Sequence, residues 1–176
     1  MSDNQNPSGQ EPSSDSLDSL AQELFSSADK DGMMVTAFIC NHAESSNGLL
    51  YASGAGVNKL NIPSNSQGPW GGNLSIGIIV DVPWSHTNKE HKVTISLVDE
   101  DSQTVFLPTG DGSVQPFHAD ASFNVGRPPS LSIGAVQNVV LGFNFLGIPF
   151  PRVGVYVFSI EIDRSEYKKL VFTVGE

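Results

Sequence analysis

Carboxylates gather in one short stretch of this sequence. Asp99, Glu100 and Asp101 follow one another, and Asp111 comes ten residues later. Carboxylate oxygens are the ligands that calcium prefers in proteins, and loops at one end of a β-structure can bring them together. A calcium site is therefore one hypothesis for these four residues. Their spacing matches no EF-hand loop, and a run of acids at a hairpin tip is also typical of a solvated turn.

Residues that could bind zinc or carry out catalysis are present but stand apart. His86 and His91 flank a polar turn, so we expect both at the solvated surface, and Cys40 is the one cysteine. Zinc sites need such ligands at short, regular spacings. No Gly-x-Ser-x-Gly motif or other nucleophile context occurs. The sequence predicts no metal, no cofactor and no enzyme, with a hydrolase whose site is dispersed along the chain as an alternative.

Glycines at positions 54 and 56, followed by Lys59, resemble a phosphate-binding loop. Phosphate loops open a helix, whose N-terminal amides face the anion, whereas a β-type run follows here. We expect these glycines to kink or bulge a strand instead.

Two aromatic residues stand in turn-like surroundings. Trp70 lies in the sequence Pro-Trp-Gly-Gly, and Phe150 ends an apolar run that contains Pro149. Such residues anchor interfaces or cover a core, and both interpretations stay open for this pair. Trp70 with the turn carboxylates also gives a second hypothesis, a loop-end site for a small sugar.

Short β-type runs separated by turn residues fill the chain from residue 33 onward, which indicates a single domain over residues 33–176. No helical pattern of useful length lies between the runs, so an antiparallel sandwich is predicted rather than a parallel sheet. Asn47-Gly48 favours a tight hairpin turn because both residues tolerate positive φ. The nine predicted strands are 34–42, 49–60, 73–82, 91–98, 104–107, 114–124, 137–146, 153–162 and 168–174.

Alternating side chains assign faces to these strands. Val139, Leu141, Phe143 and Phe145 share one face, which we expect to point into the core. In the hairpin at residues 153–174, Tyr156 is expected to keep its ring in the core and to send its hydroxyl back to nearby backbone, as in immunoglobulin-like domains. Val155 points the other way and is a candidate contact for a partner.

The N-terminal 32 residues differ from the rest, with seven acidic side chains against one lysine. They predict a disordered acidic tail that contains a short amphipathic helix at residues 16–28. The apolar stripe of this helix is a candidate tether to a partner. Its residues are Leu17, Leu20, Leu24 and Phe25.

The net charge of −10 and the lack of a basic cluster argue against nucleic acid and anionic membranes as partners. The N-terminus does not have the pattern of a signal peptide, no apolar run is long enough to span a bilayer, and a lone cysteine forms no internal disulfide. A cytoplasmic location is predicted.

Several blocks in order resemble a family of small bacterial β-sandwich proteins classed as a domain of unknown function. The resemblance covers most of residues 33–174, and it implies an immunoglobulin-like fold of about nine strands and transfers no activity. Val57 stands where such sequences often have an aromatic residue. The blocks are GLLYASGAGVNKL at 48–60, VPW at 82–84, VTISLVDEDSQTV at 93–105, FNVGRPPSL at 123–131 and LGIPFPRVGVYVFSIEID at 146–163.

By elimination, the sequence predicts a non-catalytic protein-interaction or structural module that binds another protein or its own copies. The loop-end ligand site, for calcium or a small sugar, and the dispersed hydrolase are the alternatives.

Overall fold

A computed structural model of the chain describes residues 32–176, and the predicted tail and helix at 16–28 lie outside the described residues. Twelve strands and one short 3-10 helix make up the regular structure of the described part. The elements are β1 (Met34–Cys40), β2 (His42–Ser46), β3 (Leu49–Ser53), β4 (Lys59–Asn61), β5 (Trp70–Pro83), η1 (Trp84–His86), β6 (Glu90–Asp99), β7 (Phe106–Pro108), β8 (Val114–Pro116), β9 (His118–Asn124), β10 (Val136–Phe150), β11 (Gly154–Ile162) and β12 (Ser165–Gly175). None of the described residues forms a helix long and apolar enough to cross a bilayer.

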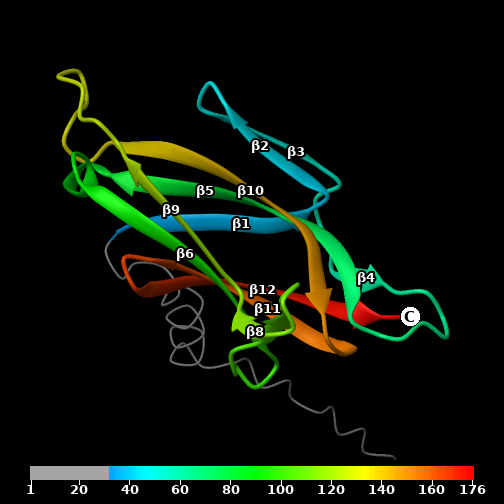
Figure 1. Ribbon diagram of the computed structural model, residues 1–176. Coiled ribbons are helices and arrows are strands. Elements are labelled where there is room, and N and C mark those ends of the chain that lie inside the picture. The colour runs from blue at the N-terminus through cyan, green and yellow to red at the C-terminus, as the bar shows by residue number, and fades with distance from the viewer. Residues whose placement is uncertain (1–31) are drawn as a thin grey trace, which may run out of the picture.

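Two sheets face each other across one core (Figure 1). The smaller has the order β1-β5-β10, and the larger has the order β4-β12-β11-β6-β9. Two short hairpins, β2-β3 and β7-β8, are attached to them. The prediction of an all-β domain is therefore confirmed.

The core forms because apolar side chains recur at every second residue of β5 and β11, so they all point to the same face of their sheet. On β5, Ile76, Ile78 and Val80 are fully buried, and on β11 Phe158 and Ile160 are fully buried from the opposite layer. Both strands lie inside their sheets, so each has neighbours that shield its apolar face on both sides.

Some predicted runs are divided in the structure, which is why twelve strands replace nine. The run 49–60 breaks at Gly54 and Gly56, whose φ values are +62° and +95°. The predicted kink at these glycines is confirmed. The segment that follows, β4, pairs with β12 in the parallel sense, so the prediction of a wholly antiparallel arrangement is wrong at this pair. The two glycines turn the chain away from β3, and β4 then joins the edge of the larger sheet beside β12.

The hairpin β2-β3 lies over the outer face of the smaller sheet. Its turn is at Asn47 and Gly48, both with positive φ as predicted. Two glycines paired across the sheet, Gly77 and Gly142, leave room for this hairpin. A Cβ on Gly142 would lie 2.7 Å from the carbonyl oxygen of Ala43, so the β2 backbone rests directly on the strand.

Candidate functional site

The strand β10 ends the smaller sheet, and its far edge pairs with no other strand among the residues that the structure describes. It is 15 residues long. From Val136 to Phe150 it contains no charged side chain, and its first proline is Pro149. Edge strands usually carry charges, prolines or bulges that discourage pairing with another chain. The one irregularity of β10, between Phe145 and Ile148, comes only near its end. The edge from 136 to 145 is therefore unprotected.

The strand β9 ends the larger sheet, and it lies on the same side of the molecule as β10 (Figure 1). Its inward residues include two small ones, Ala119 and Ala121, which reach only a short way toward β10. The two layers are consequently open to solvent along the line between β9 and β10.

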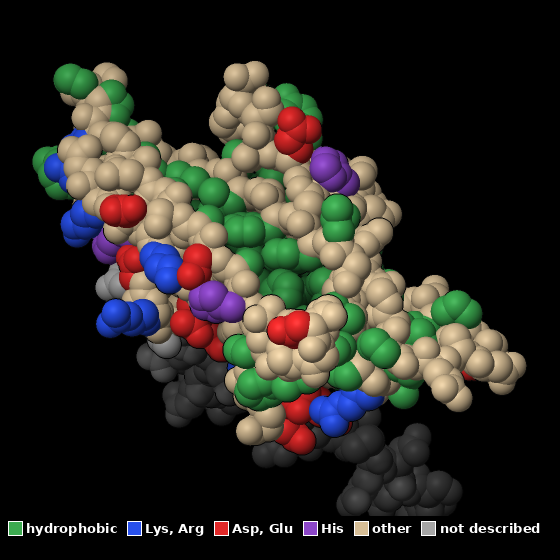
Figure 2. Space-filling view, in the orientation of Figure 1, with side chains coloured by type: hydrophobic (Ala, Val, Ile, Leu, Met, Phe, Trp, Pro, Cys, Tyr) green, Lys and Arg blue, Asp and Glu red, His purple; other side chains and the backbone are tan. Residues whose placement is uncertain are grey.

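Hydrophobic side chains fill this opening and remain partly exposed (Figure 2). We call them the apolar strip. Val139, Leu141, Phe143 and Phe145 are half-buried, although the β5 residues paired with them are at most 2% exposed. The difference arises because β5 has a strand on each side and β10 has one. The residues of the strip are Phe117, Ala119, Val139, Leu141, Phe143 and Phe145.

Ring contacts hold the aromatic part of the strip in place. Phe145 meets Phe117 edge-on at 4.9 Å between ring centres, and it stacks on the buried Phe158 at 5.9 Å. Phe143 stacks on Phe145 at 6.2 Å. Aromatic pairs at these separations are favourable beyond their buried area. The strip is thus a preformed apolar surface, continuous with the core.

Polar contacts fix the two flanks of the opening. On β10, the Asn144 side chain accepts a hydrogen bond from the backbone N–H of Ala43 (3.1 Å) and donates one to its carbonyl (2.7 Å), which holds β2 above the outer face. On β9, Asp120 binds Lys92 (2.8 Å) and His118 (2.9 Å). Hydrogen bonds from Lys92 and Thr94 lower the pKa of Asp120 to about 2. The β9 flank is therefore charged, whereas the β10 flank is neutral.

The candidate interaction residue Phe150 does not lie on the surface. Its ring is fully buried, at 5.1 Å from Tyr156 and 5.7 Å from Phe172. The interpretation of Phe150 as a contact residue is wrong, because β10 continues past its bulge and turns this ring into the core. Trp70 pairs with Phe150 in the sheet, is half-buried, and donates its indole N–H to Ser66 (2.8 Å).

Val155 lies on the outer face of β11, a strand inside the larger sheet, and is half-buried. Its role as a partner contact stays a prediction. Leu17, Leu20, Leu24 and Phe25 lie outside the described residues.

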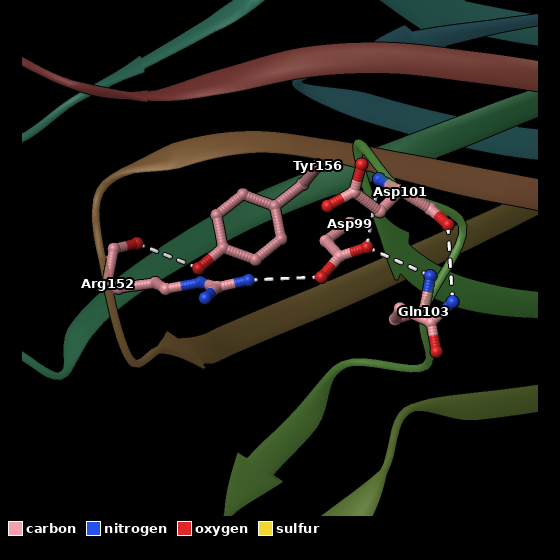
Figure 3. A network of polar contacts seen from close by, with 5 residues as sticks. All are labelled: Asp99, Asp101, Gln103, Arg152 and Tyr156. Carbon is pink, nitrogen blue, oxygen red and sulfur yellow. Dashed lines mark hydrogen bonds and ion pairs between the residues drawn. The ribbon is translucent and has the colours of Figure 1, made fainter.

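The acidic turn after β6 is occupied by its own contacts (Figure 3). Asp99 binds the Arg152 guanidinium (3.1 Å) and accepts hydrogen bonds from the backbone N–H groups of Asp101 and Gln103. A pocket of about 270 Å³ borders this turn, with Glu100 and Val155 on its wall.

The fourth calcium candidate, Asp111, belongs to the separate turn between β7 and β8. Hydrogen bonds from Thr109 and Ser113 lower its pKa to about 2. Residues 32–176 contain no group of three or more His, Cys, Asp or Glu side chains that could hold a metal ion. The structure gives the calcium hypothesis no support.

The expectation of a solvated His91 is wrong, because the ring is 2% exposed on the inner face of β6. Its Nδ1 lies 2.7 Å from Asp163 Oδ2, and its Nε2 lies 2.9 Å from the carbonyl oxygen of His86. Ser85 Oγ is 3.0 Å from His86 Nδ1. These groups do not form a catalytic triad, because both nitrogens of His91 are already bound and neither faces the serine. The outward neighbours Glu90 and Lys92 are polar, and this alternation is the sequence signal that would have placed His91 inward.

A comparison with protein families shows to which family the chain belongs. The model of DUF6941, a family of unknown function, matches residues 35–175. The chain belongs to this family. The predicted resemblance to a domain of unknown function is thereby confirmed, and the origin of the DUF6941 chain in bacteria stays a prediction. No curated protein matches the chain.

Two solved structures show distant likenesses to the DUF6941 chain. One is the alkylpurine DNA glycosylase AlkC of Pseudomonas fluorescens bound to DNA containing an abasic site analog, at 11% identity and a TM-score of 0.40 over 90% of this chain. Another is a family 123 glycoside hydrolase from Clostridium perfringens, at 16% identity and a TM-score of 0.31 over 80% of this chain. The DUF6941 chain covers 36% and 27% of those two chains. Likenesses at these TM-scores carry no argument about function.

Proposed function

We propose that the DUF6941 chain is a non-catalytic protein-interaction module that takes up an extended polypeptide segment at the free edge of β10. The observation that carries this proposal is the combination of an uncharged, unpaired edge with the half-buried apolar strip beside it. An edge strand of this kind is a ready template for another strand.

Strand addition would use both parts of the surface. The backbone of the incoming segment would bond the free N–H and C=O groups of β10, and every second side chain would point toward the apolar strip. Burial of Leu141 and Phe143 by such a segment removes apolar surface from water, which is the main favourable contribution to association. The neutral β10 flank favours a segment with few charges.

The polar groups support a role without catalysis. His91, Asp163 and Asp99 each use their polar atoms in contacts that hold turns or strands together. Groups that act on a substrate need a free polar atom directed into a pocket.

For the fold, the proposal includes an immunoglobulin-like sandwich. Its support is Tyr156, which is 1% exposed and donates its hydroxyl hydrogen to the Arg152 carbonyl (2.7 Å), four residues upstream (Figure 3). A tyrosine at the start of a late strand that bonds back in this way is a feature of immunoglobulin domains.

For location, the proposal is the cytoplasm, supported by the buried free thiol of Cys40.

A photo-crosslinking amino acid in place of Val136 or Leu146 tests the proposed surface in the cells that make the protein. These residues lie toward the two ends of the free edge and are 52% and 82% exposed. Val171, 59% exposed on β12, is the matched control position. We expect adducts from Val136 and Leu146 and none from Val171. We also expect Val140→Glu, which puts a charge on the edge, to abolish them. The proposal fails if Val136 and Leu146 give no adduct, or if Val171 gives as many.

A further inference from the structure

We propose that the segment bound at β10 is β10 of a second copy of this chain, paired antiparallel about a two-fold axis. This inference rests on the proposed function of the β10 edge and names its partner. The contact would join two three-stranded sheets into one continuous sheet, and the apolar strip of each copy would cover that of the other.

Charge favours a second copy at this edge over other places on the molecule. Each chain carries a net charge of −10, so two copies repel wherever their acidic surfaces meet. From Val136 to Phe150 no side chain is charged, so β10 itself brings no like charges into the contact. The edge of β9, in contrast, presents Asp120 with Lys92 and His118.

The opposite edge of the same sheet has less reason to associate. β1 is also uncharged, but two of its three inward residues, Ala37 and Ile39, are only 9% and 4% exposed, and Val35 alone is partly buried. Their apolar area is already covered inside one copy. On β10 the inward residues Val139, Leu141 and Phe143 are half-buried, so pairing there removes additional apolar surface from water.

The order of residues along β10 selects a register. With Leu141 opposite Leu141 of the second copy, Val139 faces Phe143 and Val140 faces Gly142. Small side chains then oppose larger ones on both faces of the sheet. The same register brings Val136 to Leu146, the first residue of the irregularity in β10, and these are the two exposed large hydrophobic residues of the strand.

The hairpin β2-β3 leaves this pairing possible. Because a Cβ on Gly142 would point at the Ala43 carbonyl, β2 lies above the outer face of β10 and not beside its edge.

The first test is the mass of the full chain in solution, by sedimentation equilibrium over a concentration series. The series should run from about 0.1 to about 100 μM, so that it spans dissociation constants on the order of micromolar. We expect the mass to rise from 18.8 kDa to that of a dimer. Val140→Glu should weaken the dimer at least tenfold, because two acidic side chains are brought close to the two-fold axis. Thr36→Glu, an exposed position on the opposite edge strand β1, should leave it intact.

The second test fixes the register and does not depend on the folding of Val140→Glu. A chain carrying both Val136→Cys and Leu146→Cys should form a disulfide-linked dimer under mild oxidation. Within one copy the two positions are ten residues apart along a strand, roughly 33 Å, so an internal bridge is excluded. Either cysteine alone should give no linked dimer. If a variant with only one of the two cysteines forms as much disulfide-linked dimer as the double variant, the register is wrong.

The outcomes separate this inference from the proposed function. A chain that stays monomeric at all concentrations, while crosslinkers at Val136 and Leu146 capture a different protein, overturns self-pairing and leaves the proposed function standing. A dimer that Val140→Glu does not weaken places the contact elsewhere and overturns the inference. A monomer without any crosslinked product overturns both.

Discussion

His91 is a buried polar side chain whose two ring nitrogens are both bound. Nε2 faces the carbonyl of His86, which can only accept, and Nδ1 faces the carboxylate of Asp163. Asp163 also accepts a hydrogen bond from the backbone N–H of Lys92 (2.9 Å), so it joins the start of β6 to the turn between β11 and β12. The ring of Phe123 lies 5.2 Å from that of His91 and closes the site from the core side.

Asp163→Asn should lower the free energy of unfolding at pH 7 by about 1 kcal/mol, a small value because the Asp163 side chain is 43% exposed and solvent screens it. Burial raises the pKa of Asp163, but the Lys92 backbone N–H and the His91 ring outweigh burial, and the pKa lies below its ordinary value of 3.8. The contribution of the carboxylate is therefore complete above pH 3.8 and is lost as the pH falls through the lower, folded value. The stability difference between wild type and variant should shrink over that range.

Urea unfolding at pH 7 and at steps below pH 4 measures this difference. Asparagine tolerates the φ of +52° at position 163, so the substitution changes the charge and leaves the backbone relaxed. Asp101→Asn, in the exposed turn after β6, is the matched control. A difference that does not vary with pH would show that the charge of Asp163 does not matter.

The element that depends most on close backbone packing is the hairpin β2-β3. It crosses the paired glycines Gly77 and Gly142, where Phe38 and Leu50 fill the space above Gly77 and the Ala43 backbone fills the space above Gly142. Backbone atoms cannot rotate away as a side chain can. The hairpin position is therefore set by the absence of a side chain at these two sites.

Gly142→Ala should destabilise the protein by about 2 kcal/mol, because the new Cβ would lie 2.7 Å from the Ala43 oxygen and would lift β2 from the sheet. Hydrogen exchange of β2 and β3 amides should become faster, and urea unfolding gives the energy. Gly126→Ala is the control, since a Cβ there meets open space. Equal stability of the two variants would contradict the close contact.

At the scale of the whole molecule, the distribution of charge decides how copies meet. The net charge of −10 acts between copies over a distance that salt shortens. A neutral contact at β10 contains no ion pairs for salt to weaken. Salt should therefore affect only the repulsion between the net negative charges of the two copies.

We predict that the dissociation constant of the dimer falls several-fold between roughly 0.02 M and 0.5 M sodium chloride, as screening reduces the repulsion. Sedimentation equilibrium at each salt concentration measures it. A dissociation constant that rises with salt would instead indicate a contact held by ion pairs, such as those of Lys92 and Asp120 at the β9 edge.

Much of the fold was predictable from local pattern. Alternation placed Val139, Leu141, Phe143 and Phe145 on the inward face of their strand, and Asn47-Gly48 marked its hairpin turn. The contact of the Tyr156 hydroxyl with nearby backbone was also predictable, because the acceptor is four residues away. These features depend on period-two geometry and on residues close in the chain.

The candidate site could not be found in this way, since an edge exists only after the order of strands is set. The residue types alone show that β10 is uncharged and which of its side chains point inward. Three features required the folded structure: β10 and β9 end their sheets on the same side, Phe150 belongs to the core, and β4 pairs in the parallel sense. The physical reason is that alternation follows from each strand's own backbone, whereas strand order, exposure and the open edge follow from pairing between residues far apart in the chain.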